Sequence, residues 1–361
     1  MKHFIYPIKD TTIYSYSASM NTGIDEILEI EKTIPVGTEP IHKARAIIGF
    51  DFDTEWKQLT SSFSSFSSSW AADTWASKFR LYTTKAEKIR YSYVIEASPI
   101  KISSTGNWQM GLGRRSHTPI TEEGCSWAFR TESGSDAWLQ PGGDFWQYPN
   151  ITTQAFEYES TDIAIEASHS IAKWQTTTDG DKKGVIFKFS SSLEEDTLEY
   201  GCIKFFSRDT NTIYSPRLEL AWDDSEFSTG SLSAATSDEI LVYVKNNKYE
   251  YNENEVVRFE VRARDTYVTQ TYGTSSAALE TFYLPTGSYY AIKDAETEEA
   301  VIDFDTSYTK ISCTSSGNFF NVYMKALTPE RLYKLVLKVN NRKYNGQVEH
   351  FDPNIVFRIA R

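Results

Sequence analysis

The chain has 361 residues, of which 40% are hydrophobic and 14% aromatic, and its formal net charge is −12. These values exclude a disordered chain, and the length favours two or three folded domains because it exceeds what one hydrophobic core organises. Basic residues are interleaved with acids, as in 258–265, and no apolar run approaches the roughly 18 residues that cross a bilayer. We therefore expect no direct nucleic-acid partner and no membrane partner.

The sequence from residue 11 to residue 222 consists mostly of short segments in which β-branched and aromatic residues alternate with polar ones. Such alternation predicts half-buried strands, and turn-rich connections between them predict a β-sandwich. The expected strands are 11–16, 25–31, 44–53, 79–83, 90–97, 163–167, 185–189, 203–206 and 217–222.

Two stretches depart from this alternation. Residues 60–76 contain a Ser-rich run that predicts a surface loop. Phe63, Phe66 and Trp70 lie there at positions i, i+3 and i+7, so a short amphipathic helix is the alternative. Residues 103–150 are rich in Gly and Trp, and we expect them to form long loops or extra strands laid over the sandwich.

A change of composition after residue 222 marks the main domain boundary. All nine tryptophans lie between Trp56 and Trp222, and residues 223–239 contain five acids and no base. This composition is typical of a solvated linker. We therefore expect one domain over 1–222, with the Trp-rich insertion around 103–150. An acidic linker over 223–239 and a second domain over 240–361 follow. The second domain begins strand–turn–strand and has a natural size for an immunoglobulin-like sandwich.

Two segments of the first domain resemble a known family. Residues 43–53 resemble the "R-x-hydrophobic-hydrophobic-x-F-D" strand of DNRLRE jelly-roll modules, and residues 205–220 resemble the closing "S-R-E…P-R-L" hairpin of that family. Such modules are similar to carbohydrate-binding jelly rolls and occur in cell-surface and phage structural proteins. Residues 248–259 resemble the Ig-like segments of tailed-phage virion proteins. The resemblance implies an all-β chain in which a jelly-roll-like β-sandwich precedes a smaller immunoglobulin-like β-sandwich.

The search for catalytic and cofactor motifs returns none. A GxSxG nucleophile elbow and an HExxH zinc pair are absent, and Gly111-Leu112-Gly113 lacks the third glycine of a dinucleotide loop. Cysteines 125, 202 and 313 are widely spaced and odd in number, which predicts neither a disulfide framework nor a zinc site. We therefore predict no catalytic, cofactor-binding or metal-binding residues and no cofactor.

Glycosidase chemistry needs two carboxylates across a sugar, and the Trp-rich insertion offers Glu122, Glu123 and Asp144 as the least implausible acids. Solvated loop acids are the favoured alternative. The same insertion holds the candidate contact residues, namely Trp108, Trp127, Trp138, Trp146 and Tyr148. Aromatic side chains of this kind form a core, anchor a subunit interface or stack on sugar rings, and all three roles remain open.

The leading hypothesis is a non-enzymatic structural component of a phage virion, at the neck, the tail or baseplate, or as a capsid decoration. Residues 1–7 show no export signal, so we expect synthesis in the host cytoplasm and a final location in the virion. The expected partners are other virion proteins, in multiple symmetric copies. The alternative is a carbohydrate-binding adhesin that contacts a host surface glycan through the Trp-rich loops, and a polysaccharide-degrading enzyme is less favoured.

Overall fold

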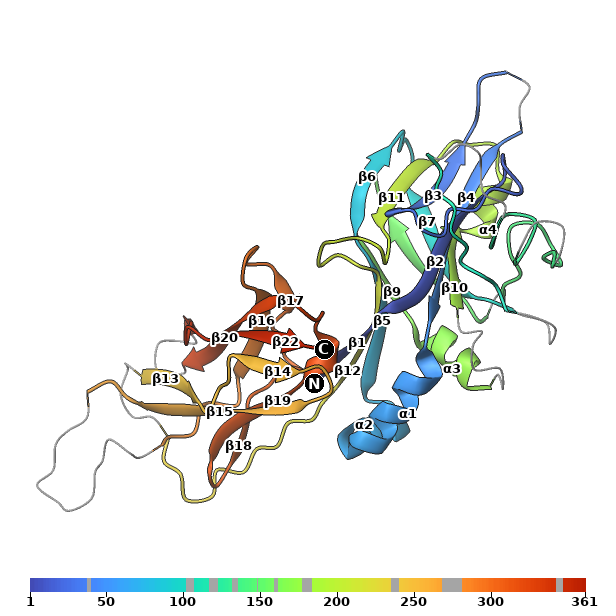
Figure 1. The fold of residues 1–361 in the computed structure, drawn as a ribbon. Coiled ribbons are helices and arrows are strands. Elements are labelled where there is room, and N and C mark those ends of the chain that lie inside the picture. The colour runs from blue at the N-terminus through green and yellow to red at the C-terminus, as the bar shows by residue number, and fades with distance from the viewer. Residues whose placement is uncertain are drawn as a thin grey trace, which may run out of the picture. The chain divides into compact units, whose positions relative to one another are not determined.

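The computed structural model confirms a predominantly β protein, with 45% of residues in strands and 12% in helices (Figure 1). Several antiparallel sheets are present, including one that curls into a half-barrel. The structure describes residues 1–37, 40–101, 107–116, 123–131, 136–147, 149–158, 162–176, 184–234, 240–267, 281–341 and 347–361. Within those ranges, no helix has the length and apolar character that a membrane span requires.

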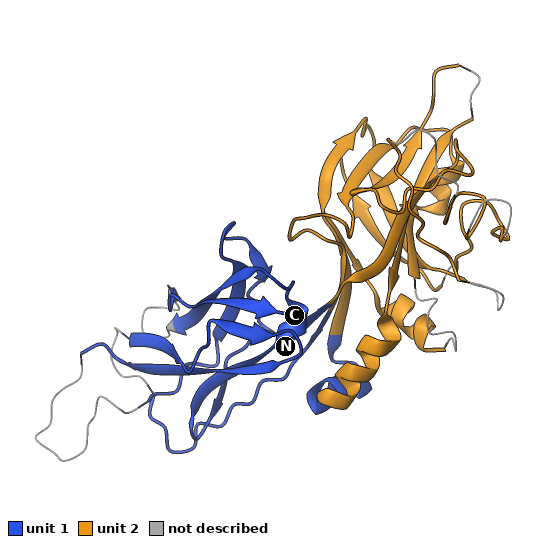
Figure 2. Ribbon diagram, in the orientation of Figure 1, with its two compact units in different colours: residues 1–4, 63–75, 220–361 blue, residues 5–62, 76–219 orange. Residues whose placement is uncertain are grey.

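The chain divides into two compact units (Figure 2). Unit 1 consists of residues 1–4, 63–75 and 220–361, and unit 2 consists of residues 5–62 and 76–219. The larger part of each unit is one of the two sequence regions on either side of residue 220.

Unit 2 contains the curled eight-stranded sheet, with the order β6-β11-β3-β4-β10-β7-β8 and with β2 paired to β4. Its strands are β2 (Pro7–Tyr14), β3 (Ile27–Thr33), β4 (His42–Phe50), β6 (Thr83–Glu87), β7 (Tyr93–Pro99), β8 (Thr152–Phe156), β10 (Gly184–Phe189) and β11 (Gly201–Phe206). A further sheet has the order β1-β12-β5-β9. Its strands are β1 (Lys2–Ile5), β12 (Arg217–Trp222), β5 (Trp75–Leu81) and β9 (Ile163–Glu166).

Helices occur where the sequence analysis expected a strand end and a loop. The described helices are α1 (Phe52–Ser62), α2 (Ser64–Ala71), α3 (Ser168–Thr176), α4 (Ser191–Glu195) and the single 3-10 turn η3 (Met324–Ala326). The loop prediction for the Ser-rich run is wrong and its helical alternative is right, because Phe66 is fully buried on α2. Within unit 1, the Phe63 and Phe66 rings pack at 5.6 and 4.9 Å from the Trp222 ring. Burial of these aromatic rings stabilises a helix whose serines have little intrinsic helical preference.

The Trp-rich insertion covers one face of the curled sheet. Strands β2, β4 and β10 contribute isoleucines to that face, and the insertion contributes Trp and Cys side chains. The resulting buried cluster consists of Ile13, Ile47, Ile100, Trp108, Cys125, Trp138 and Ile186. In the described parts of the insertion, isolated β-bridges such as Phe129 with Ala137 take the place of regular strands.

A single buried amide side chain fastens the insertion to the chain that follows β2. Asn21 Nδ2 donates to the Met110 and Cys125 carbonyls at 2.7 and 2.8 Å. Its Oδ1 accepts from the Gly23 and Gly113 amides at 3.1 and 2.9 Å. A primary amide has two donor hydrogens and two acceptor lone pairs, so all four are used.

We expect Asn21→Ala to lower the free energy of unfolding by about 2–3 kcal/mol, because four hydrogen bonds are lost and buried partners stay unpaired. Urea denaturation would measure the loss. Asn150→Ala is the matched control, since Asn150 in the same insertion makes one long bond of 3.4 Å, to the Gln147 carbonyl. Equal effects of the two substitutions would contradict the role assigned to Asn21.

Unit 1 contains two further sheets, with the orders β13-β15-β19-β18 and β14-β22-β20-β16-β17, and β21 pairs with β20. The strands are β13 (Ile240–Lys245), β14 (Glu250–Asn252), β15 (Val256–Asp265), β16 (Ser288–Asp294), β17 (Ala300–Ile302), β18 (Ser312–Thr314), β19 (Gly317–Tyr323), β20 (Leu332–Asn341), β21 (Gln347–Phe351) and β22 (Val356–Ala360). Aromatic rings join the two sheets, because Phe320 stacks on Tyr290 at 4.2 Å and Phe259 contacts Phe357 at 5.8 Å.

Residues 223–234, the described part of the stretch expected to be a linker, lie along unit 1. The Cys313 amide donates to the Glu226 carbonyl, and the Ser228 amide donates to the Cys313 carbonyl, both at 2.8 Å. The Asp223 carboxylate pairs with Lys310 Nζ at 2.7 Å. These bonds attach the acidic stretch to β18.

Candidate functional site

The structure gives different surroundings to the four candidate tryptophans, which all lie among the described residues. Trp108 and Trp138 belong to the buried cluster beneath the insertion, with 1% and 5% of their surface exposed. Trp127 is half-buried, and the guanidinium carbon of Arg45 lies 4.8 Å from its ring centroid. Trp146 is half-buried and lines a pocket. Tyr148 lies outside the described residues.

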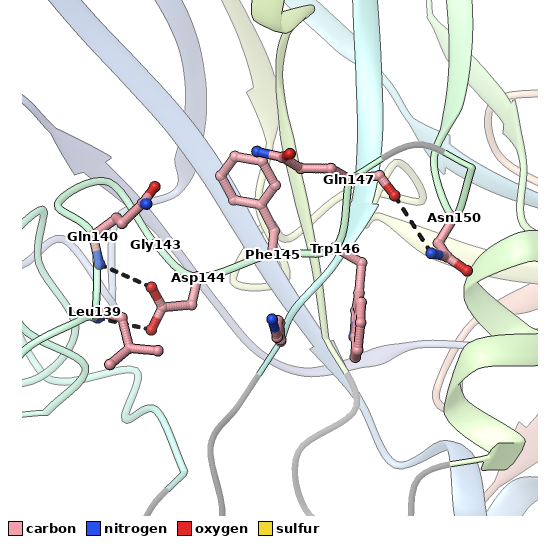
Figure 3. A pocket seen from close by; sticks show the side chains of 9 residues that line it. Leu139, Gln140, Gly143, Asp144, Phe145, Trp146, Gln147 and Asn150 are labelled. Carbon is pink, nitrogen blue, oxygen red and sulfur yellow. Dashed lines mark hydrogen bonds between the residues drawn. The ribbon is translucent and has the colours of Figure 1, made fainter.

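The Trp146 pocket has a volume of about 460 Å³ and lies within unit 2 (Figure 3). This volume is in the range of small-ligand sites, about 300–1,000 Å³. One lining residue lies two positions after the end of β7, and the others come from the end of the insertion. The lining consists of Lys101, Leu139, Gln140, Gly143, Asp144, Phe145, Trp146, Gln147 and Asn150.

Backbone pairing positions the pocket segment against the end of β7. The Lys101 amide donates to the Asp144 carbonyl at 2.8 Å, and the Trp146 amide donates to the Pro99 carbonyl at 2.9 Å. Ile100 and Phe145 form an isolated antiparallel bridge between these two bonds. The pocket residues are therefore fixed by strand-like pairing that the loop-rich composition does not reveal.

The Asp144 carboxylate shapes the loop on one side of the pocket. It turns back and accepts hydrogen bonds from the Leu139 and Gln140 amides at 2.9 and 3.0 Å (Figure 3). Among the described lining residues, Asp144 is the only acid. Of the other acids considered for glycosidase chemistry, Glu123 is exposed and Glu122 lies outside the described residues. The described lining thus does not form a pair of opposed carboxylates.

A network of buried charged side chains lies next to the pocket lining. Arg45 Nε and Nη2 donate to the two oxygens of the Glu194 carboxylate at 3.0 and 2.5 Å, and Nη1 donates to the Gly142 carbonyl at 2.6 Å. Lys188 Nζ lies 3.4 Å from Glu96. The four charged side chains are each less than 10% exposed. Burial lowers the pKa of Lys188, and the two glutamates oppose that shift.

This network also fixes the aromatic floor of the pocket. The Phe145 ring lies 5.4 Å from the Arg45 guanidinium carbon and 5.0 Å from Lys188 Nζ. Cation–π contacts of this kind strengthen away from water. Arg45 belongs to the segment that resembles the DNRLRE strand motif, and the structure shows that its side chain joins β4 to the insertion.

Two lysine side chains lie next to the Trp146 ring, at one side of the pocket. Lys173 Nζ of α3 lies 3.7 Å from the Trp146 ring centroid, and Lys101 Nζ lies 4.9 Å from it. The remaining polar lining groups are the amide side chains of Gln140, Gln147 and Asn150.

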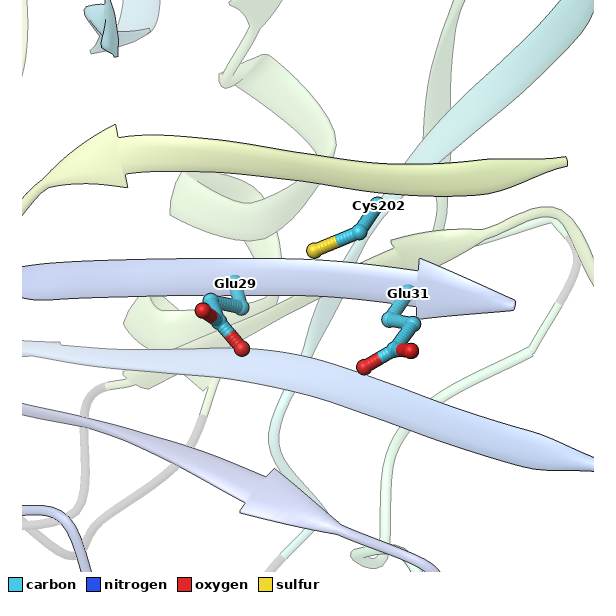
Figure 4. A group of neighbouring side chains, drawn as sticks. All are labelled: Glu29, Glu31 and Cys202. Carbon is cyan, nitrogen blue, oxygen red and sulfur yellow. The ribbon is translucent and has the colours of Figure 1, made fainter. Parts of the chain in front are cut away.

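A second cluster was not predicted from the sequence. Glu29, Glu31 and Cys202 bring their ligand-type atoms within 4.8 Å of one another on β3 and β11 (Figure 4). Residues 29 and 31 share a face because successive strand side chains alternate, and Cys202 is the cross-strand partner of Glu31. This strand register brings the three side chains together, and a sequence pattern does not reveal it.

Electrostatics favour an internal ion-pair network over a metal site in this cluster. Glu29 accepts from Tyr14 Oη at 3.0 Å, pairs with Arg115, and lies 3.3 Å from Lys204 Nζ. These two cations neutralise Glu29 and would repel a metal ion. Burial raises the pKa of the Cys202 thiol, which disfavours the thiolate that binds metals.

Comparison with known proteins adds no family to these findings. The chain matches no protein-family model. No curated protein matches it in sequence. The fold and the site therefore define a predominantly β protein with several antiparallel sheets, in which described residues of the insertion line a polar, aromatic pocket.

Proposed function

We propose that this protein is a non-enzymatic structural component of a phage virion, placed at the neck, the tail or baseplate, or as a capsid decoration. In this proposal unit 2 is a jelly-roll-like sandwich and unit 1 is a smaller immunoglobulin-like sandwich. The two segments that resemble DNRLRE modules, 43–53 and 205–220, cover most of β4 and of β12, and the segment that resembles phage Ig-like domains includes β14. The protein would be made in the host cytoplasm and act in the virion.

The observation that carries the proposal is an apolar and arginine-rich face on unit 1. Leu241 and Tyr243 of β13 and Val256 of β15 are 42%, 42% and 49% exposed. The register places Leu241 opposite Arg264 and Tyr243 opposite Arg262. Tyr and Arg are enriched where proteins bind one another, while isolated surface apolar residues need no explanation. We name these five residues the β13–β15 face and propose that another virion protein docks there, in multiple symmetric copies.

Composition of purified particles tests this proposal. We expect particles from cells infected with the phage that encodes the chain to contain it in a fixed copy number. The double variant Leu241→Ser/Tyr243→Ser should reduce that copy number roughly tenfold, because buried Tyr side chains are frequent hot spots. Quantitative mass spectrometry of gradient-purified particles would measure it.

The matched control is Leu198→Ser, which removes a side chain of similar exposure, 41%, from unit 2. Urea denaturation of each purified variant checks that it is folded. Wild-type particles that lack the chain would overturn the virion assignment. Normal incorporation of the double variant would overturn the β13–β15 face as the docking surface.

A second candidate function, carbohydrate binding, is favoured by the Trp146 pocket. Its described lining combines the aromatic side chains of Phe145 and Trp146, three amide side chains and an exposed Leu139, and sugars need both apolar contact and hydrogen bonds to hydroxyls. Among the described lining residues the one acid accepts two backbone amide hydrogen bonds, which supports binding without hydrolysis. Binding of a free oligosaccharide that is lost in Trp146→Leu is the result that this candidate requires.

A further inference from the structure

We infer that the Trp146 pocket selects saccharides that carry a carboxylate, such as uronic or sialic acid residues, over neutral ones. The inference rests on the carbohydrate-binding function proposed above and specifies the ligand class. It follows from the charges around one ring and from the state of the acid in the same pocket.

Two lysine ammonium groups already contact the Trp146 ring. A neutral sugar stacks on an indole through its apolar C–H face and needs that face uncovered. Lys173 Nζ at 3.7 Å from the ring centroid already covers one face of the indole, and Lys101 Nζ lies 4.9 Å away. The ring therefore serves to hold two ammonium groups beside the pocket. The ammonium of Lys101, the only cation among the described lining residues, attracts an anion to the pocket.

Asp144, the one acid among the described lining residues, keeps its negative charge, but the backbone of residues 139–140 holds its carboxylate and it forms no ion pair with Lys101. In the ion pairs between described residues, Lys101 has no carboxylate partner. Lys101 is exposed, so its flexible stem can move the ammonium from the indole to a ligand carboxylate at small cost.

The remaining lining groups suit the rest of a sugar ring. Leu139 is 74% exposed and offers apolar contact to C–H groups. Gln140, Gln147 and Asn150 offer amide donors and acceptors for hydroxyls. Charge-assisted hydrogen bonds are about twice as strong as neutral ones, so the carboxylate contact should decide between acidic and neutral sugars.

Titration with matched sugars tests the inference. One pair is trigalacturonate and its methyl ester, which removes the charge and keeps the ring; the other is 3′-sialyllactose and lactose. Isothermal titration calorimetry with the full chain should show at least tenfold tighter binding of one acidic sugar than of its neutral partner. Raising the salt concentration should weaken binding of the acidic sugar but not of the neutral one, because ions screen exposed charges.

The variants Lys101→Gln and Trp146→Leu should each weaken binding of the acidic sugar roughly tenfold or more. Lys78→Gln, which changes an exposed lysine of β5 in the same unit, is the matched control and should leave binding unchanged. Urea denaturation confirms that each variant folds.

Each other outcome overturns a distinct part of the argument. Equal binding of charged and neutral partners, unaffected by Lys101→Gln, would overturn acid selection and leave carbohydrate binding standing. Acidic binding that persists in both pocket variants would overturn the assignment of the site. Binding of none of the four sugars would overturn the inference and the carbohydrate-binding function together.

Discussion

Replacing Arg45 by Met is expected to lower the free energy of unfolding by about 3–5 kcal/mol, because it leaves a buried carboxylate without its main partner. Glu194 is 5% exposed and loses both bonds from the guanidinium. The Gly142 carbonyl loses its donor as well. The loss should therefore loosen the floor of the Trp146 pocket, and urea denaturation would measure the change.

The double variant Arg45→Met/Glu194→Leu distinguishes the loss of the ion pair from the cost of leaving the Glu194 carboxylate buried without Arg45. A buried ion pair replaced by apolar side chains of similar volume is often neutral in stability, so the double variant should recover most of the loss. Arg358→Met is the control, since its partner Glu250 and Arg358 itself are 49% and 40% exposed, and exposed pairs contribute about 0–1 kcal/mol. A double variant no more stable than Arg45→Met would contradict this account.

Replacing Asp10 by Asn is expected to remove a pH-dependent loss of stability. Asp10 lies on β2 with 1% of its surface exposed. Its Oδ2 accepts from the Arg208 amide at 2.7 Å, while its buried Oδ1 has no hydrogen-bond partner among the described residues. Burial raises the pKa of this carboxyl to about 7. The asparagine amide keeps the acceptor and carries no charge.

The sign of the effect follows from proton binding. Between pH 4 and 7 the folded state holds a proton on Asp10 that the unfolded chain has released, since an unperturbed Asp has a pKa of about 3.9. The stability of the wild type therefore falls as pH rises through this window and levels off above the folded-state pKa. The stability difference between Asp10→Asn and wild type should grow by on the order of 3 kcal/mol from pH 4.5 to pH 8.

Urea denaturation at several pH values measures this difference, and any constant cost of the substitution cancels in the comparison. Asp51→Asn, at an exposed position, is the control and should show no comparable dependence. A difference between Asp10→Asn and wild type that stays constant with pH would contradict the assignment.

The sequence predicted most strands of the curled sheet, but it missed β6 and β8, and it predicted helices α1 and α2 poorly. Alternation of apolar and acidic residues marked β3, and a short apolar run marked β10, which is buried along its whole length. Helix α1 begins inside a segment expected to be a strand, since Phe50 and Phe52 continue the alternating pattern past the last paired residue. The Ser-rich helix α2 depends on burial of Phe63 and Phe66 in unit 1, which local preference does not encode.

The candidate site was predicted as a region and not as a set of contacts. Trp-rich composition indicated the insertion, but the same residue type in the same loops became core at Trp108 and Trp138 and pocket wall at Trp146. Loops have no period from which an inward or outward direction follows, so the sequence left all roles open. Lys101 and Lys173 meet on one ring although 72 positions separate them.

The sequence by itself determined that this is a predominantly β protein, because strand periodicity is a local property of the chain. Tertiary structure alone decided which charges are buried together, as in the pairing of Arg45 with Glu194. It also decided that Glu29, Glu31 and Cys202 lie close together, and that two lysines contact the ring of one tryptophan. Such groupings depend on strand register and on the path of the insertion, which are set by packing between residues distant in the chain.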